Sequence, residues 1–166
     1  IGTDTQKKGE YFLNLNRTLK GKTLIYAGSF SNITSLSNLI LETSPKIDSV
    51  LLNDFSDWLG KNYDYNWNLT LLAKRGVGVH NGSLHRSLSQ IQIKLFEENE
   101  GLNRLISTSS IIEGVNTSAE NVIVWMTSGR GLQFSNFAYK NLIGRAGRMF
   151  KHFIGNIYVL ATLVSR

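Results

Sequence analysis

Five short apolar runs, separated by stretches with helical spacing, constrain the fold of this chain most. The runs are Thr23–Ala27, Gly76–His80, Leu102–Ile106, Asn121–Met126 and Asn156–Ala161. Because they are apolar at consecutive rather than alternate positions, we expect both faces of each strand to be buried. Such strands separated by helices are typical of a parallel sheet covered on both sides, so we predict an α/β fold.

Two of the intervening stretches have clear helix-start signals. The first helix is expected to begin at Ser31 or Asn32, either of which could serve as its N-cap. The second is expected to begin at Ser44 and Pro45, because proline is tolerated at the first helical position. Residues 62–68 are polar and aromatic, and we interpret them as a loop.

The composition is that of a single domain with a basic character. The chain has 166 residues, of which 42% are hydrophobic and 18% charged, so it can bury a sizeable core. Its net charge of +6 favours a polyanionic partner such as nucleic acid, although many domains without such a partner are mildly basic. The absence of cysteine excludes disulfides and thiolate metal sites, and the histidines have no metal-ligand spacing, so no metal site is predicted.

The amino-terminal region carries no recognisable motif. Residues 1–20 are polar and do not resemble a signal peptide, so we expect them to lead into one domain that spans residues 1–166. The chain begins with Ile1 rather than Met, which suggests part of a longer chain. No apolar run approaches the ~20 residues needed to span a bilayer. We therefore expect an intracellular, cytoplasmic protein without a membrane partner.

Two arginines near the end of the chain are each preceded by glycine. Residues 141–148 read NLIGRAGR, which places Arg145 and Arg148 three positions apart. A helix or turn puts such positions on one side, so both guanidinium groups could reach one anion. An always-charged guanidinium stabilises the charge that develops on a transferred phosphoryl group. The alternative is a surface arginine pair that binds carbonyl groups at a helix end.

A hydroxyl-rich segment follows the third apolar run. Residues 107–116 read STSSIIEGVN, so Thr108 and Ser109 are expected at the carboxyl end of a strand. Ligands of open parallel sheets bind beyond these ends, and hydroxyl groups with free backbone N–H groups suit a phosphate oxygen. The same residues could instead cap a helix, and the two roles are compatible.

In this order and spacing, residues 107–116 and 141–148 resemble motifs V and VI of the superfamily-2 helicases. The Gly-Val-Asn at residues 114–116 resembles that of the DExH-box exosome-type and repair-type branch. The resemblance implies a C-terminal RecA-like domain, with a parallel sheet of about five to six strands and helices on both faces. It implies that Arg145 and Arg148 act as arginine fingers. It also implies that four residues face ATP: Gly114, Asn116, Asn141 and Gly144. The family usually has Gln where this chain has Asn141, an amide that is one methylene shorter.

The resemblance extends to two earlier loops. The first follows the first apolar run, where the family has motif IV. The second, residues 78–84 (GVHNGSL), resembles the family's His-x-Gly-x-Leu motif, with an arginine after it. Together with the hydroxyl-rich segment, these matches imply contacts with the nucleic-acid backbone by Ser29, Phe30, His80, Asn81, Gly82, Arg86, Thr108 and Ser109. A plain strand-to-helix turn is the alternative for the first loop, and a structural role is the alternative for the histidine.

The groups that hold Mg²⁺ and the ATP phosphates in such motors are missing from this chain. Gly21, Lys22 and Thr23 resemble the end of a P-loop, but Asn16 stands where the P-loop needs glycine, and the lysine leads into a strand. We therefore expect ATP with Mg²⁺ to bind only together with the N-terminal RecA-like domain of a longer chain, and the isolated chain to be inactive as an ATPase. The remaining partner is an RNA or DNA strand. The alternative is a non-catalytic binding module that kept the helicase fold.

Overall fold

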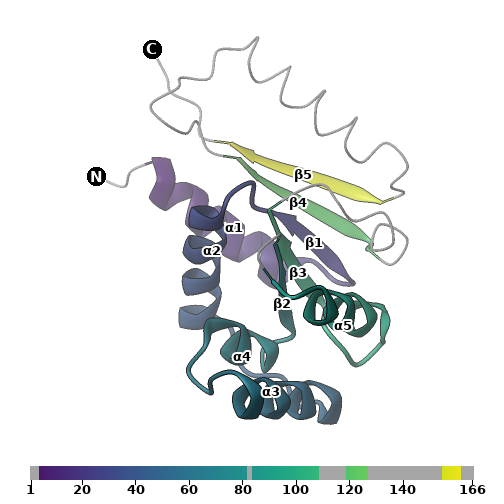
Figure 1. The fold of residues 1–166 in the computed structure, drawn as a ribbon. Coiled ribbons are helices and arrows are strands. Elements are labelled where there is room, and N and C mark those ends of the chain that lie inside the picture. Colours follow the sequence, from purple (N-terminus) through teal and green to yellow (C-terminus); the bar gives the residue numbers. More distant parts are fainter. Residues whose placement is uncertain (1–3, 82–83, 109–118, 127–154, 162–166) are drawn as a thin grey trace.

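The computed structural model describes residues 4–81, 84–108, 119–126 and 155–161. Five parallel strands form one sheet in the order β2-β3-β1-β4-β5 (Figure 1). The strands are β1 (Thr23–Tyr26), β2 (Val77–His80), β3 (Arg104–Ser107), β4 (Asn121–Met126) and β5 (Asn156–Ala161). Their positions confirm the five apolar runs as strands of a parallel α/β sheet. The burial expected of every strand is not found in β5, where Asn156 is exposed and Ile157 is 37% exposed.

Five helices accompany the sheet in the described parts of the chain. They are α1 (Asp4–Thr18), α2 (Phe30–Thr43), α3 (Val50–Asn62), α4 (Asn68–Ala73) and α5 (Arg86–Glu97). In Figure 1 the strands lie between α2 on one side and α5 on the other. Residues 127–154, between β4 and β5, lie outside the described residues.

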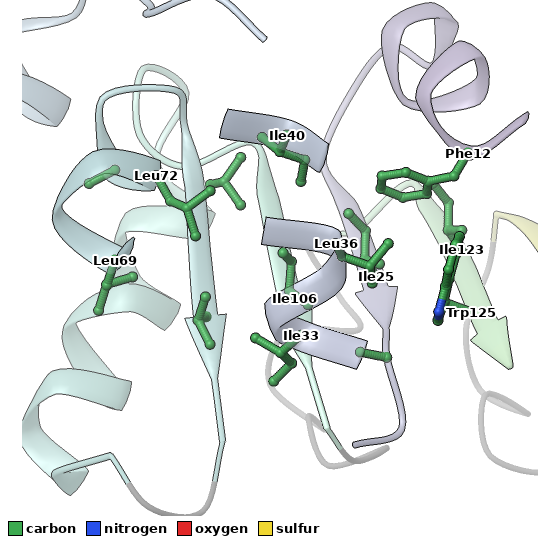
Figure 2. Packing of buried hydrophobic residues seen from close by; sticks show 14 of the residues in the cluster. Phe12, Ile25, Ile33, Leu36, Ile40, Leu69, Leu72, Ile106, Ile123 and Trp125 are labelled. Carbon is green, nitrogen blue, oxygen red and sulfur yellow. The ribbon is translucent and has the colours of Figure 1, made fainter. Parts of the chain in front are cut away.

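Successive residues of the central strand face two separate cores. Ile25 belongs to a core shared with α1, α2 and α4, in which Phe12, Leu36 and Leu72 are buried (Figure 2). Its neighbour Leu24 belongs to a second core that includes Phe96 of α5. This arrangement explains why the strands are apolar at consecutive positions: helices cover both faces of the sheet.

Two helix starts differ from the sequence prediction. The N-cap of α2 is Ser29 rather than Ser31 or Asn32, and its Oγ accepts a hydrogen bond of 3.1 Å from the Asn32 backbone N–H. Ser44 ends α2 instead of starting the next helix, so Pro45 follows a C-cap, where proline is also common. The N-cap of α3 is Ser49, whose hydroxyl accepts from the Leu52 backbone N–H.

The polar amino-terminal region forms a helix that packs on the sheet. Phe12 of α1 is fully buried and meets the Trp125 ring edge-on, with 5.7 Å between ring centroids. The Nζ atom of Lys8 lies 4.3 Å from the centroid of the same indole ring, and burial lowers the pKa of Lys8 to about 8. The Phe12 ring and the Lys8 ammonium group therefore hold α1 against Trp125 of β4.

A buried arginine fixes the end of α1 to the amino ends of the strands. The guanidinium of Arg104, in β3, donates to the backbone carbonyls of Asn16, Leu19 and Gly21 at 2.8–2.9 Å and to the Asn16 side chain at 2.6 Å. Burial lowers the pKa of Arg104 to about 10, so the group remains charged near neutral pH. These bonds satisfy carbonyls at and beyond the end of α1.

The free edge of β2 is covered by a side chain. The amide of Gln92, in α5, accepts a hydrogen bond of 2.7 Å from the Val79 N–H and donates one of 2.8 Å to the Val79 carbonyl. Both bonds are buried, and Gln92 itself is fully buried. Gln92 thus satisfies the backbone groups that an edge strand otherwise leaves unpaired. Gly78 leaves room for it, because a Cβ there would lie 2.7 Å from the Gln92 Oε1.

We predict that Gln92→Leu lowers the free energy of unfolding by about 2–6 kcal/mol, because two buried backbone groups lose their partners at about 1–3 kcal/mol each. Urea denaturation followed by circular dichroism measures the change. Gln90→Leu, at an exposed position of the same helix, is the matched control and should change the stability by less than about 0.5 kcal/mol. Equal stabilities of the two variants would contradict this role for Gln92.

Candidate nucleic-acid interface

Three of the loops singled out in the sequence meet at one edge of the sheet. The parallel register aligns Ser107 of β3 with Tyr26 of β1 on one side and with His80 of β2 on the other. The Ala27 N–H donates to the Ser107 carbonyl at 2.7 Å, and the Thr108 N–H donates to the His80 carbonyl at 3.3 Å. The carboxyl ends of three neighbouring strands therefore form one surface, as expected for a ligand site in an open parallel sheet.

The first loop joins β1 to α2 and contains Ser29 and Phe30. Gly28 has a φ of +85°, a left-handed conformation that favours glycine. Ser29 is exposed and caps α2, while the Asn32 side chain donates to the Ala27 carbonyl at 2.7 Å and closes the turn. Ser29 therefore has a structural role as the N-cap of α2. The first turn of α2 contains no acidic residue, so its positive end remains favourable for an anion.

Phe30 is the first residue of α2, and 57% of it is exposed. The Phe30 ring therefore contributes little to the core. The first buried side chain of α2 is Ile33, one turn further along the helix. The ring lies beside Ser29, on the surface formed by the strand ends.

The second loop follows β2 and contains His80 and Asn81. His80 is half-buried, and its Nδ1 atom is buried without a hydrogen-bond partner. Burial lowers the pKa of His80 below its usual 6.5, so the imidazole is neutral near pH 7. His80 could therefore approach a phosphate as a neutral N–H donor and not as a cation. The Asn81 side chain accepts from the Leu84 backbone N–H at 3.1 Å and orders the turn that leads into α5.

Arg86 is the exposed first residue of α5, which starts at the same edge. The side chain of the N-cap residue His85 makes no capping hydrogen bond, and the first turn of α5 has no acidic residue. The free N–H groups of this turn and the Arg86 guanidinium together favour a phosphate group. Gly82, the other residue predicted for this loop, lies outside the described residues.

The third loop begins with Thr108, which is half-buried and bonded through its backbone to His80. Its neighbour Ser109 lies outside the described residues, as do Gly114 and Asn116. The arginine segment with Asn141, Gly144, Arg145 and Arg148 also lies outside them. β4 runs parallel to β1, so it ends at the same edge, and the chain towards the arginine segment leaves from there.

The described residues show neither a metal cluster nor a membrane helix. Within residues 4–81, 84–108, 119–126 and 155–161, no three His, Cys, Asp or Glu side chains are grouped so that they could hold a metal ion. None of the helices that the structure describes is both long and apolar enough to cross a membrane.

No protein-family model matches the chain. Anti-bacteriophage protein B of Escherichia coli K12 is 39% identical over 108 residues, which is 65% of this chain and 15% of that protein. DNA polymerase theta of Drosophila melanogaster is 34% identical over 64 residues, which is 39% of this chain and 3% of that protein. The chain thus spans only a small part of the curated relatives that it matches.

Among solved structures, a variant of the S. cerevisiae Dbp5 C-terminal domain, bound to Gle1 and IP6, has a similar fold. It matches with a TM-score of 0.51 and 16% sequence identity, over 95% of this chain and 71% of that one. The chain therefore has a RecA-like α/β fold, as predicted from the sequence.

We predict that acid destabilises the chain in part through His80. The folded chain releases the His80 proton more readily than the unfolded chain does, so the unfolded state binds more protons as the pH falls below about 6.5. The free energy of unfolding should therefore fall between about pH 7.5 and about pH 5, and His80→Gln should reduce this fall. Urea denaturation at both pH values measures it. His85→Gln, at an exposed position, should keep the wild-type dependence on pH; an equal dependence in the His80 variant would refute the prediction.

Proposed function

We propose that this chain is the second RecA-like motor domain of an ATP-dependent nucleic-acid helicase or translocase of the DExH-box exosome-type and repair-type branch. The observation that carries the proposal is the convergence of Ser29, His80, Asn81, Arg86 and Thr108 at one edge of a RecA-like sheet. Two α-helices of twelve or more residues begin at this edge without an acidic residue in the first turn. Such an edge suits a chain of phosphates.

In the proposed mechanism the strand-end loops hold the sugar-phosphate backbone. Ser29, Asn81 and Thr108 bring neutral polar side chains, and Arg86 brings charge. Contacts with phosphates position a strand but carry no sequence information, so binding should be largely independent of sequence. Whether the strand is RNA or DNA depends on contacts with the 2′-hydroxyl group.

ATP is the proposed substrate of the complete motor, with Mg²⁺ held by the first RecA-like domain. Gly114, Asn116, Asn141 and Gly144 are proposed to face the nucleotide. Arg145 and Arg148 are proposed to stabilise the charge on the γ-phosphate when the two domains close. The support is the order and spacing of these residues in the sequence together with the RecA-like fold.

We predict that Arg148→Ala, in a longer protein that contains both RecA-like domains, lowers nucleic-acid-stimulated ATP hydrolysis by about 10³-fold or more and leaves nucleotide binding largely unchanged. Phosphate release and nucleotide titration measure the two effects. Arg17→Ala, at an exposed position in α1, is the matched control and should keep wild-type turnover. Unchanged hydrolysis in the Arg148 variant would instead favour a binding module that kept the fold.

We predict that Arg86→Ala weakens binding of a single strand and reduces its dependence on salt. Loss of one phosphate contact should lower the slope of log affinity against log salt by about 0.7 for a single strand. Fluorescence anisotropy with a labelled oligonucleotide over a series of salt concentrations measures the slope for the wild type, for Arg86→Ala and for the control Arg17→Ala. A slope identical to that of Arg17→Ala would place Arg86 away from the strand.

A further inference from the structure

A small pocket opens beside the strand-end loops, between the start of α2, the start of α4 and the end of β2. Its volume is about 170 Å³. The aromatic residues Phe30 and Trp67 line it together with Asn68, Asn81 and Leu84. Its inner wall is apolar and includes Ile33 and Leu69, which Figure 2 shows on α2 and α4. The pocket is smaller than the ~300 Å³ of typical small-molecule sites, so it suits one ring system and not a whole nucleotide.

We propose that this pocket takes one unstacked nucleobase of the bound strand, an inference that rests on the proposed function. The position of the pocket supports it. Ser29 immediately precedes Phe30, and Asn81 lies in the pocket wall, so residues proposed to contact phosphate flank the opening. A strand held at the edge of the sheet would therefore carry its bases past the Phe30 ring.

The chemistry of the pocket matches a base better than a phosphate or a charged side chain. Phe30 is 57% exposed at a helix start, and Trp67 is half-buried, so both rings are available for contact. An aromatic face stacks with any base, whatever its identity. The polar residues of the lining carry no charge: they are the amides Asn68 and Asn81 and the hydroxyl residues Thr34 and Ser37. The pocket should therefore bind a base without selecting which one.

The aromatic surface continues beyond Trp67, but its charge does not favour nucleic acid. Tyr63 lies 5.1 Å from Trp67 and 6.0 Å from Trp58 between ring centroids, along α3 and the loop that follows it. The exposed acids Asp57 and Asp64 lie next to these rings in the sequence. Carboxylates repel a phosphate backbone. The stacking site consequently ends at Trp67, and one base is the expected occupant.

Oligonucleotides that lack a single base test the proposal. The probes are labelled oligothymidine and oligouridine strands of the shortest length that this chain binds, so that only one register is available. Each carries one abasic site, placed at each position in turn, and fluorescence anisotropy gives their affinity for this chain. We expect one position at which the missing base weakens binding by about tenfold. At every other position the effect should be small, because the phosphates are unchanged.

Two variants connect that position to the pocket. Phe30→Ala should weaken binding of the intact strand by a similar factor, yet cause no further loss with the strand that is abasic at the sensitive position. Phe30→Tyr should restore binding, because its ring also stacks. Phe30 is exposed, so these changes should leave the fold intact, which circular dichroism verifies. Tyr11→Ala, which removes a 63% exposed ring from α1, is the matched control and should bind as the wild type does.

The outcomes separate the two proposals. If the wild type binds strands but every abasic position behaves alike, or if Phe30→Ala has no effect, the base pocket is refuted while the phosphate contacts stand. The pocket would then be available for an apolar protein side chain. If the wild type binds neither strand at low salt, the proposed nucleic-acid function fails, and the base pocket fails with it.

Discussion

The parallel pairing of β1 with both β3 and β4 is the constraint on which the rest of the structure depends. The register places Tyr26 beside Ser107 on one side and beside Val124 on the other. A shift of one residue would exchange Leu24 and Ile25 between the two cores, which differ in the helices that fill them. The same register brings the carboxyl ends of the strands to one edge. The geometry of the core therefore also determines which loops are neighbours.

Strand positions could be predicted from the sequence because each strand appears as an apolar run, and most residues of β1 to β4 are buried. Helix boundaries could not, because serine has several roles in this chain. Ser29, Ser31 and Ser44 are all plausible N-caps by residue type. Ser29 accepts the Asn32 N–H at the start of α2, whereas Ser44, whose backbone is also extended, ends that helix. Tertiary contacts, absent from a local pattern, decided between them.

The amino-terminal helix was not foreseen for a related reason. Residues 4–18 contain few apolar side chains, so their helical period is weak. Their position depends on Phe12 against Trp125 and on Arg104, residues far apart in the sequence. A similar limit applies to β2, because a local pattern gives no indication that Gln92 covers its free edge. The location of the loop residues Ser29, His80 and Thr108 at one edge could be anticipated, since it follows from strand order in a parallel sheet.

The candidate interface shows what sequence patterns leave out even when they locate residues correctly. A histidine beside a predicted phosphate site suggests a positive charge, but burial lowers the pKa of His80 and leaves it neutral. Trp67 belongs to a loop that the sequence marks only as polar and aromatic, and its proximity to Phe30 depends on the packing of α4 beside α2.

The neutral His80 and the aromatic pocket point in the same direction. Among the described residues proposed to hold the strand, Arg86 is the cation, and the others offer amides, hydroxyl groups or rings. Neutral groups of this kind hold a strand through its shape and spacing, while attraction over longer distances comes from the lysines and arginines that give the chain its net charge of +6. In the proposed motor such a division would favour turnover, because a strand bound mainly by charge would resist release in each cycle. Neutral contacts at the strand ends, with few cations among them, would hold the nucleic acid in a defined position and still allow its release.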